Sequence, residues 1–577
     1  MTLVSAPGKV LVAGGYLVLD ARYFGLVFAA NARFYTLVKT ITADGEAPLI
    51  RVRSPQFANA AWSYRIVLPP TGHDDAVMYA NGMRIVQLNT GSNANPFVAF
   101  TLLYTLQVAM EVTGVDHVLA ALQSGIEIVV LGDNDYYSHR SNGHAPTLEE
   151  LRALPPFVAL GCTLEEVHKT GLGSSAAMTT SLTAGVLLHL GACRTEMHEN
   201  EARLTLGSLG LIHNVAQLAH CAAQGKVGSG FDVSASVWGS QLYRRFDPFL
   251  LQESMQPEVG RRILQEGELG VEKHPTALLP VLAASNPLWK PVPPSGVQSV
   301  PTAVEGLLDI AVGGTDGAVC PAALQLPPGI RMCLADVDAG SNTRALVGQV
   351  SAFKKNQPTW AEQLFSVISA ANQYFADGLL RLHLAYAHDA SVYIRDLTAL
   401  AQIPSTEWDA HQKLLQSPIV SAFIDVRNAM RSIRAGMREL GVRADAPIEP
   451  MEMSRLLDAT INGASGVLGG GVPGAGGYDA LYVLYLDSTG YDACAPCSPH
   501  SGILAVWANY TALSVGPLLC GADAECAAHK VPPEHNADPA LEQVLHTFAR
   551  TQFGLRVEDP TAVHGLGPYT ASLSQQR

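Results

Sequence analysis

The chain has 577 residues, 48% of them apolar, which is enough for a sizeable core and more than one average domain. Lysine and arginine number 37 against 51 for aspartate and glutamate, and the resulting net charge of −14 argues against nucleic acid or an anionic membrane as a partner. No apolar run reaches the roughly 18 to 20 residues of a membrane span, and no signal-peptide pattern opens the chain. Nine cysteines suit free thiols in a reducing compartment, so we expect a soluble cytoplasmic protein.

The first elements of the chain are predicted to be strands. Residues 2–19 are rich in β-formers and are interrupted by Pro-Gly at 7–8 and Gly-Gly at 14–15. This pattern predicts a strand, a tight turn and a second strand. Lys9 lies beside the first turn, where its ammonium either reaches the surface along the aliphatic stem or faces a cleft.

The alternating pattern continues beyond the first strands. Residues 26–40 and 48–69 are predicted to form antiparallel sheet. A helix is expected over 96–112 and a buried strand over 126–131. That strand leads into DNDYYSHRSNG at 133–143, for which a solvated connection is the plain interpretation.

The segment KTGLGSSAA offers a place for a phosphate-sized anion. Gly171 and Gly173 allow backbone N–H groups to turn toward one point, and Ser174 and Ser175 bring hydroxyls that can bind a ligand or cap the helix predicted to follow. Unpaired N–H groups and the positive end of the helix dipole meet at such a start. An ordinary serine-capped helix is the alternative, but Lys169 just before the loop favours a nucleotide. The Walker pattern is absent.

A second glycine-rich segment, GKVGSGFDVSASVWG at 225–239, follows a helix predicted over 201–224. Its glycines allow the backbone to approach a ligand closely. Lys226 and Asp232 are opposite charges among small residues, where an aspartate must be paired or solvated, so a cleft is favoured over a core. Two arginines at 244–245 follow just past a strand.

Three motifs stand in the order typical of the GHMP kinase superfamily. They are SAPGKVLVAGGYLVLD at 5–20, KTGLGSSAA at 169–177 and GVPGAGGYDA at 471–480. Longer matches resemble the eukaryotic type of phosphomevalonate kinase within that superfamily: NPF at 95–97, DNDYYS at 133–138, QGKVGSGFDV at 224–233 with YRRF after it, DVDAGSNTRALV at 336–347 and PIEP at 447–450. The resemblance covers both ends and most of the middle of the chain.

The resemblance implies an α+β fold of two domains with the nucleotide between them. The N-terminal domain, with the glycine-loop nucleotide site, is expected over 1–245, and a ferredoxin-like C-terminal domain over 331–577. The Pro-rich segment 249–330 departs from the family and is interpreted as an insertion or linker. Amphipathic helices are predicted over 360–386 and 418–440, with their apolar residues in the core.

The activity implied by the resemblance is ATP-dependent phosphorylation of (R)-5-phosphomevalonate to (R)-5-diphosphomevalonate, with Mg²⁺ as cofactor and release of ADP. Lys9 and Asp232 are then expected at the reacting centre, with Ser175 on Mg²⁺. The implied nucleotide-binding residues are Lys169, Gly171, Leu172, Gly173, Ser174, Ser175 and Ala176. The implied substrate-binding residues are Lys226, Ser229, Gly230, Arg244, Arg245, Ser341, Thr343, Gly474, Ala475 and Gly476.

Other functions stay open at this point. The protein is alternatively another small-molecule kinase such as a mevalonate kinase, the related diphosphomevalonate decarboxylase, or a non-catalytic sensor of the same fold. Intact Lys9, Ser175 and Asp232 argue against the sensor. The expected partner is a small-molecule substrate, with no nucleic acid and no membrane, and the expected state is a monomer or homodimer.

Three further patterns concern ligands in the second half. The turn before the helix that begins near Thr343 is a second place for an anion, with a plain helix cap as the alternative. GGGVPGAGGYDA has six glycines in twelve residues, too many for packing alone, and is predicted to lie against the nucleotide loop and the substrate. Zinc binding by Cys494, Cys497, His500, Cys520 and Cys526 is disfavoured, because the second cysteine pair is too widely spaced.

Overall fold

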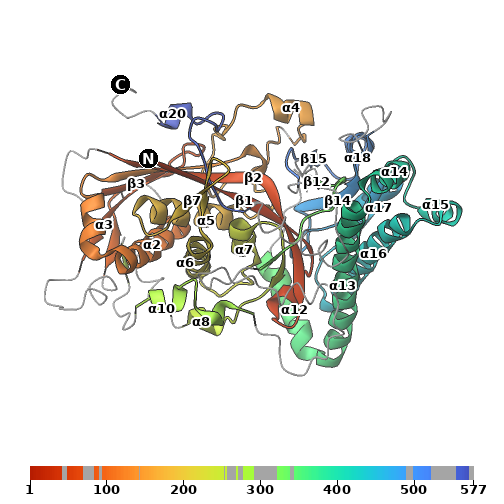
Figure 1. Ribbon diagram of the computed structural model, residues 1–577, viewed down its shortest axis with the longest axis horizontal. Coiled ribbons are helices and arrows are strands. Elements are labelled where there is room, and N and C mark those ends of the chain that lie inside the picture. The colour runs from red at the N-terminus through yellow and green to blue at the C-terminus, as the bar shows by residue number, and fades with distance from the viewer. Residues whose placement is uncertain are drawn as a thin grey trace.

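A computed structural model of the chain describes residues 1–41, 49–68, 83–89, 94–141, 143–252, 254–255, 268–270, 277–291, 321–337, 343–488, 498–521 and 554–570. Two sheets form the framework, one in each half of the molecule (Figure 1). The larger sheet and the helices α2, α5, α6 and α7 make up the N-terminal half. The long helices α13 and α16 mark the C-terminal half.

The N-terminal half is built on the longer strands. Its elements are β1 (Thr2–Ala13), η1 (Leu17–Leu19), β2 (Phe24–Thr40), β3 (Leu49–Arg53), β4 (Ala61–Val67), β5 (Arg84–Gln87), α2 (Pro96–Thr113), α3 (Val115–Leu122), β6 (Ile126–Gly132), η2 (Asn134–Tyr136), α4 (Leu148–Ala153), α5 (Ser174–His189), β7 (Thr195–His198), β8 (Glu201–Leu204), α6 (Leu206–Gln224), α7 (Phe231–Trp238) and β9 (Gln241–Arg244). Three short strands from later in the chain join this sheet, namely β10 (Glu268–Gly270), β11 (Ala322–Ala323) and β16 (Arg556–Val557). In the described residues the sheet has 10 strands, in the order β10-β5-β4-β3-β6-β2-β1-β16, with β9 on β2 and β11 on β9.

Helix α5 lies directly on β1 and β2, and α2 and α6 pack beside it. Gly185 permits this close approach, because a Cβ there would lie 3.1 Å from the Thr36 side chain on β2. Asn95 caps α2 by accepting hydrogen bonds from the N–H groups of Phe97 and Val98. The sequence-based expectation that no apolar run is long enough to span a membrane was wrong for α2, which meets both the length and hydropathy criteria. Its most apolar window is 72% buried inside the protein, as is common for core helices.

The C-terminal half carries a small antiparallel sheet with helices packed on it. Its elements are β12 (Ile330–Val337), α12 (Thr343–Asn356), α13 (Pro358–His388), α14 (Ala390–Ala401), α15 (Trp408–Leu415), α16 (Pro418–Ala444), α17 (Met451–Gly463), β13 (Val467–Gly471), β14 (Ala480–Leu486), α18 (Pro499–Ala508) and β15 (Val515–Pro517). The strand order is β13-β14-β12-β15. With helices between β12 and β13 and between β14 and β15, this is the βαββαβ arrangement of ferredoxin-like folds. The expected α+β class is confirmed.

Most predicted elements are present, and three predictions were wrong in part. In the region 48–69, β3 pairs antiparallel with β4 as expected but parallel with β6. The segment 2–19 is one long strand followed by the 3₁₀ turn η1, because β1 stays paired with β2 through a register shift between Pro7 and Lys9. The helix expected over 201–224 begins only at Leu206. The four residues before Thr205 pair as β8 with β7, and the Thr205 hydroxyl accepts from the N–H of Ser208 to start the helix.

Most of the described part of the segment 249–330 packs on the N-terminal half, but its last residues contact the C-terminal half, where Gln325 O and Pro328 O accept hydrogen bonds from His383 and Tyr393. The segment contains α8 (Phe249–Gln252), β10 (Glu268–Gly270), α10 (Leu279–Leu282), η3 (Pro287–Trp289) and β11 (Ala322–Ala323). Leu282 and Trp289 are buried in the main core. The Glu111 carboxylate at the end of α2 accepts from the N–H groups of Leu278 and Leu279, at 2.9 and 2.6 Å. The domain bounds stay a prediction.

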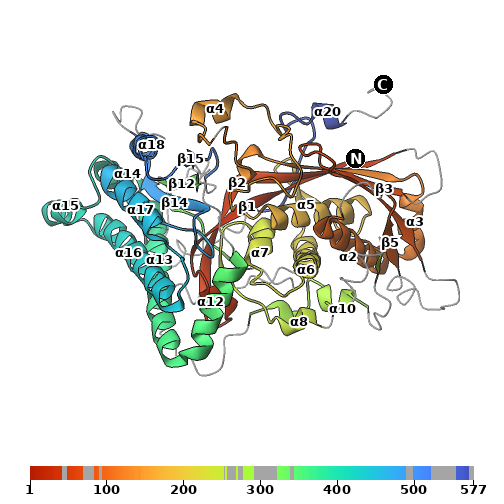
Figure 2. The ribbon, with the colours of Figure 1, turned by 180° about the vertical axis from the view of Figure 1, so that it is seen from behind.

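The C-terminal segment returns to the first strands. Strand β16 (Arg556–Val557) pairs with β1, and Leu566, just before α20 (Gly567–Thr570), packs with Leu3 and Leu37. Helix α20 and the labelled N-terminus accordingly lie on the same side of the N-terminal half in both ribbon views (Figure 2).

Candidate active site

The glycine loop leaves the start of α5 open. Gly171 and Gly173 have φ values of 78° and 81°, in the left-handed region that favours glycine. Gly173 is the N-cap and no side chain caps the helix, so the alternative of an ordinary serine-capped helix is wrong. The N–H groups of the first turn and the hydroxyls of Ser174 and Ser175 are therefore not used for capping, which suits an anionic ligand.

Lys9 crosses from β1 to this loop. Its Nζ donates to Gly171 O at 2.9 Å, and its backbone N–H donates to Leu172 O at 2.9 Å. Burial lowers the pKa of Lys9, and the nearby carboxylate of Asp232 opposes that effect. A side chain at Gly173 would lie 3.0 Å from Lys9 Cε, so the glycine makes room for the lysine. The Lys9 ammonium therefore lies at the glycine loop, near the Asp232 carboxylate, and does not extend away from the protein into solvent.

Helix α6 brings the starts of α5 and α7 together. Ala176, Ala216 and Val233, one from each helix, are buried against one another. The small side chains allow the helices to approach closely, so Ser175 and Asp232 both lie beside the same part of α6.

His220 of α6 contacts both of these oxygen donors. Its Nε2 is 3.1 Å from Ser175 Oγ, and its Nδ1 is 3.9 Å from Asp232 Oδ2. Burial lowers the pKa of His220, against a smaller opposing effect of Asp232, so the imidazole is neutral near pH 7. No sequence pattern identified His220 as a site residue, although it lies twelve residues before Asp232 and near the end of the helix that packs against the starts of α5 and α7.

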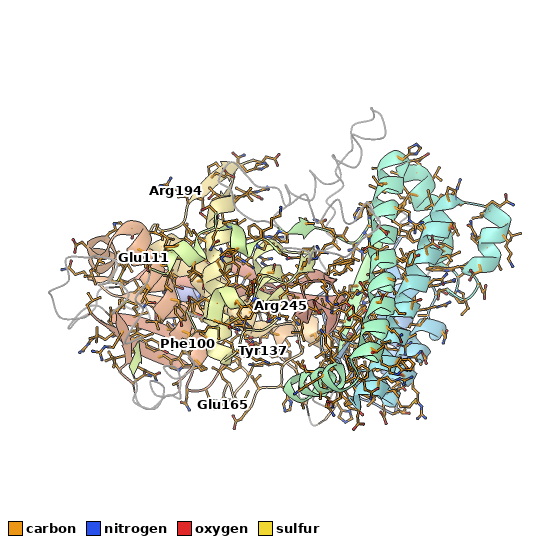
Figure 3. The ribbon with its side chains drawn as sticks, turned by 90° about the horizontal axis from the view of Figure 1, so that it is seen from below. Phe100, Glu111, Tyr137, Glu165, Arg194 and Arg245 are labelled. Carbon is orange, nitrogen blue, oxygen red and sulfur yellow. The ribbon has the colours of Figure 1, made fainter. Side chains whose placement is uncertain are left out.

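An open cavity of about 200 Å³ lies next to the start of α5. It is lined by Phe34, Ser54, Phe57, Trp62, Ala94, Asn95, Pro96, Phe97, Val98, Val130, Tyr137, Leu164, Glu165, Lys169, Ser174, Ser175 and Met178. The lining residues are mainly aromatic and aliphatic, and the polar ones are Ser54, Asn95, Glu165, Lys169, Ser174 and Ser175. Tyr137 lies toward the middle of the molecule, whereas Glu165 points outward at its edge (Figure 3).

The C-terminal glycine motif lies against β1 and the glycine loop, as predicted. Gly474 N–H donates to Leu11 O at 3.4 Å, and Tyr16 Oη donates to Ala475 O at 2.5 Å. The end of the motif lies near the glycine loop, because a Cβ placed at Gly171 would lie 4.0 Å from the Cβ of Ala480. Two segments about 300 residues apart in sequence thus share one wall of the cleft.

The basic residues after α6 differ in their surroundings. Lys226 is exposed. The Arg245 guanidinium donates to the carbonyl oxygens of Leu19, Val227 and Gly228 at 2.7, 3.1 and 2.6 Å. Arg245 therefore holds two backbone segments together, whereas Arg244 ends strand β9.

The segment before α7 is similarly fixed through its backbone. Ser229 O accepts from the Tyr243 hydroxyl, and Gly230 O accepts from Gln217 Nε2 at 2.6 Å. Gly230 is the N-cap of α7 with φ 84°, a conformation that favours glycine.

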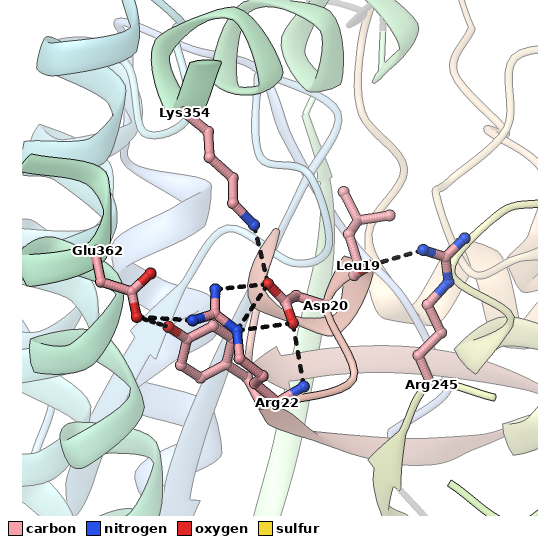
Figure 4. Close-up of polar contacts among 7 residues, drawn as sticks. Leu19, Asp20, Arg22, Arg245, Lys354 and Glu362 are labelled. Atoms are coloured by element: carbon pink, nitrogen blue, oxygen red, sulfur yellow. Dashed lines mark hydrogen bonds and ion pairs between the residues drawn. The ribbon is translucent and has the colours of Figure 1, made fainter. Parts of the chain in front are cut away.

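A second group of charges, which the sequence analysis did not identify, lies at the end of the first motif. Arg22 donates to both carboxylate oxygens of Asp20, and Lys354 of α12 donates to Asp20 Oδ2 at 2.9 Å (Figure 4). Arg22 Nη1 also donates to Glu362 of α13 at 2.8 Å. Burial alone would raise the pKa of Asp20, but the hydrogen bonds from Arg22 and Lys354 hold it well below its usual range. The cluster joins the end of η1 to the C-terminal half.

The polar segment after β6 is not simply solvated. Tyr136 and Tyr137 are buried, and Arg140 donates to the carboxylate and the backbone oxygen of Asp336 at the end of β12. The hydroxyl of Ser138 also donates to that carboxylate, at 2.7 Å. These contacts join two of the family-like motifs across the halves.

Some predicted residues are described only in part or not at all. Thr343 begins α12, while Ser341 lies outside the described residues. Cys494, Cys497 and Cys526 also lie outside them, so the zinc hypothesis is not tested. Within the described ranges, no group of three or more His, Cys, Asp or Glu side chains is arranged to hold a metal ion.

Comparison with known proteins identifies relatives over most of the chain. No family model matches it. It is 32% identical over 525 residues to the peroxisomal phosphomevalonate kinase of Arabidopsis thaliana, covering 86% of this chain and 92% of the relative. It is 35% identical over 491 residues to a phosphomevalonate kinase of Gibberella zeae, covering 84% and 87%. It is 33% identical over 519 residues to a phosphomevalonate kinase of Aspergillus fumigatus, covering 85% of this chain and 88% of the relative.

Among solved structures, the phosphomevalonate kinase of Streptococcus pneumoniae in complex with phosphomevalonate and AMPPNP is 12% identical, covers 90% of this chain and 99% of its own, and has a TM-score of 0.45. The family assignment depends instead on the sequence relatives, three of which are 32% to 35% identical with at least 84% of this chain aligned. The chain belongs to the phosphomevalonate kinase family.

Proposed function

We propose that the protein transfers the γ-phosphoryl group of ATP to (R)-5-phosphomevalonate, giving (R)-5-diphosphomevalonate and ADP, as a step of the mevalonate pathway of isoprenoid synthesis. The observation that carries this proposal is the convergence of Lys9, the open start of α5 and the start of α7 in one cleft. Family membership supports the same reaction.

The nucleotide phosphates bind at the start of α5 in this proposal. The N–H groups of the first turn and the helix dipole favour negative charge there. The adjoining cavity of about 200 Å³ receives the base, because its aromatic and aliphatic lining offers surfaces for stacking while Asn95 and Lys169 add polar groups. The residues from Lys169 to Ala176 are therefore proposed as the nucleotide site.

Magnesium fits the donors that are present. Mg²⁺ is usually held by one or two carboxylates together with substrate phosphates and water, rather than by a cage of protein ligands. Ser175 Oγ and the Asp232 carboxylate are such donors, and both lie next to His220. When bound, the ion neutralises charge on the transferring phosphates.

The acceptor determines which protein groups matter. The second pKa of a phosphate monoester is about 6, so the phosphate group of phosphomevalonate is mostly dianionic at pH 7 before it reaches the site. Catalysis then depends on bringing two polyanions, ATP and the acceptor, close together. A positively charged group reduces their repulsion, whereas a general base would contribute little because the acceptor has already lost its proton. Lys9 is directed at the loop where the phosphates bind, and Asp232 stands opposite at the start of α7.

The substrate is proposed to lie between the segment 226–230 and the C-terminal glycine motif 474–476, with Ser341 and Thr343 beside it. Lys226 is exposed and can reach an anion, whereas Arg245 is engaged with three carbonyl groups. Arg244 is proposed as a further cation of this site.

Variants of these basic residues test the substrate site. We expect Lys226→Ala to raise KM for phosphomevalonate by about tenfold, or ~1.4 kcal/mol, with KM for ATP and the melting temperature unchanged. Arg245→Ala should lower the melting temperature, because it frees two backbone segments. Unchanged phosphomevalonate KM in Lys226→Ala, Arg244→Ala and Arg245→Ala would remove these residues from the site.

A coupled assay of ADP release tests the reaction itself. Mevalonate, 5-phosphomevalonate and 5-diphosphomevalonate are offered in parallel, with ATP and Mg²⁺. ADP is expected with phosphomevalonate alone. ADP release with mevalonate identifies a mevalonate kinase, release with diphosphomevalonate together with CO₂ identifies a decarboxylase, and binding without turnover identifies a sensor.

We also propose that the protein is cytoplasmic and that it is a monomer or a homodimer. It is proposed to have no nucleic-acid or membrane partner. The net charge of −14 supports the last point. One relative is named peroxisomal, so fractionation of the tagged protein is the direct check on location.

A further inference from the structure

His220 lies between two oxygen donors of the proposed site and has no part in the chemistry described above. The side chain is on α6 with 3% of the residue exposed. Its two ring nitrogens face different partners, with Nε2 3.1 Å from Ser175 Oγ and Nδ1 3.9 Å from Asp232 Oδ2. A buried polar ring with a separate neighbour at each nitrogen is well placed to orient them.

The contact with Ser175 fixes the direction of one proton. A neutral imidazole has one N–H donor and one acceptor nitrogen. Because the Asp232 carboxylate faces the Nδ1 edge, the proton belongs on Nδ1, and Nε2 is the acceptor. The Ser175 hydroxyl then donates its proton to Nε2, which leaves the lone pairs of its oxygen available to a ligand at the first turn of α5.

The ring itself is held in place. Gln224, one turn further along α6, has its Nε2 3.3 Å from His220 Nε2. The ring of Phe97, which also lines the cavity beside α5, has its centroid 5.5 Å from that of His220. His220 is thus fixed by neighbours on two helices before any ligand binds.

We propose that His220 is a positioning residue that holds the oxygen of Ser175 toward a metal–nucleotide complex at the start of α5. The inference rests on the proposed function, because it requires that a metal–nucleotide binds there. Outer partners of ligating groups commonly contribute about 10- to 100-fold in metal affinity. The effect of removing the acceptor nitrogen should therefore appear in the gain of nucleotide affinity that Mg²⁺ brings.

Two near-isosteres separate the two nitrogens. Glutamine can place an amide oxygen where Nε2 lies and so keep the acceptor for Ser175, whereas asparagine reaches only as far as Nδ1. Affinity for AMPPNP is measured by calorimetry with Mg²⁺ and again with EDTA. Mg²⁺ is expected to increase the AMPPNP affinity about tenfold less in His220→Asn than in wild type. In His220→Gln the increase should stay within about threefold of the wild-type value. In EDTA both variants should bind AMPPNP as tightly as wild type.

His213 supplies the matched control. It lies two turns earlier on α6, contacts Asn214 and Trp289, and is away from Ser175. His213→Asn should leave the Mg²⁺-dependent gain unchanged. A merely structural role of His220 would instead lower affinity equally with and without Mg²⁺, and that result overturns the inference. So does a His220→Asn variant with the full gain.

A double variant keeps the inference open to refutation if His220→Asn does not fold. Ser175→Ala should lose the Mg²⁺-dependent gain in AMPPNP affinity. The double variant of Ser175→Ala with His220→Gln should lose little more of that gain than Ser175→Ala alone. Loss of the gain in His220→Gln alone overturns the inference. A wild-type protein that binds no AMPPNP contradicts the proposed function as well, whereas binding without any effect of these variants contradicts only the role of His220.

Discussion

At the scale of single residues, the surroundings of Lys9 explain how an acidic chain can act on anions. The molecule has a net charge of −14, so attraction of a phosphate depends on cations placed locally. Lys9 Nζ is held by Gly171 O and lies 5.7 Å above the ring of Phe231. Asp232 counteracts the loss of charge that burial favours, which helps to keep a positive charge beside the loop that is proposed to bind the nucleotide phosphates.

Substitution of Lys9 tests this assignment. We expect Lys9→Ala to lower kcat for phosphomevalonate by about a hundredfold, or ~3 kcal/mol, because one preorganised cation is removed. Asp232→Asn should cost less, since the dianionic acceptor needs no general base. Steady-state kinetics of the two variants decide the matter, and a larger loss at Asp232 would indicate proton transfer and an alcohol acceptor.

Two further carboxyl groups make stability depend on pH. Burial raises the pKa of Asp133 to about 7, with the N–H of Arg33 opposing it, and raises the pKa of Asp135 to about 6. The folded protein therefore binds a proton at Asp133 that the unfolded chain has lost above its ordinary carboxyl pKa of ~3.9. Stabilisation from this group is present at low pH and is lost as the pH rises toward 7.

The sign of that effect leads to a specific expectation. Asp133→Asn should melt at a higher temperature than wild type at pH 8, and the difference should shrink toward pH 5. The exposed carboxylate of Asp425 provides the control, because Asp425→Asn should differ from wild type by a constant amount across this range. Thermal melts at several pH values measure both, and a difference that does not change between pH 5 and 8 would contradict the expectation for Asp133.

At the scale of elements, the C-terminal glycine motif depends on backbone conformation. Gly474 and Gly476 both have positive φ, at 67° and 81°. A Cβ at Gly476 would lie 2.1 Å from Ile448 O, whereas nothing lies within 4 Å of one at Gly474. The turn can thus accept a side chain at one glycine but not at the other without moving the segment before α17.

These two glycines form a matched pair. Gly474→Ala should destabilise the protein by about 1 kcal/mol, the usual cost of a left-handed non-glycine residue. Gly476→Ala should destabilise it clearly more and raise KM for both substrates, because the motif must move away from Ile448. Denaturant unfolding and kinetics measure these effects, and equal destabilisation by the two variants would show that the contact with Ile448 is not limiting.

At the scale of the whole molecule, an apolar contact and a neighbouring charged cluster couple the two halves. Tyr16, Leu17 and Tyr23 of the first half pack with Phe365 and Ile368 of α13. The Asp20 cluster adds charged hydrogen bonds to α12 and α13 next to this apolar contact (Figure 4). The two halves are therefore expected to unfold together.

Removal of the central carboxylate tests that coupling. Asp20→Asn should destabilise the protein by about 2 kcal/mol at pH 7, the scale of a hydrogen bond to a charged group, because Arg22 and Lys354 lose their shared partner. Since the pKa of Asp20 is held below its usual range, this difference should persist to pH 4 and shrink only in stronger acid.

Asp425→Asn is again the control. Its ion pair with Arg381 leaves both side chains about half exposed, at 45% and 50%, so the loss should stay within about 1 kcal/mol. Chemical unfolding at pH 7 and pH 4 compares the two variants. Similar losses in both would show that the Asp20 cluster contributes no more than a surface ion pair.

The sequence by itself predicted the helices over 96–112, 360–386 and 418–440, the buried strand over 126–131 and the loop at 171–175, because these depend on local patterns of apolar residues and glycine, while the family resemblance implied the α+β class. Only the tertiary structure decided that β1 continues past Pro7, since pairing with β2 outweighs the local turn signal. It also brought His220 between Ser175 and Asp232, and Lys354 to Asp20. No local pattern marks such contacts, because partners up to 334 residues apart meet only when helices and strands pack.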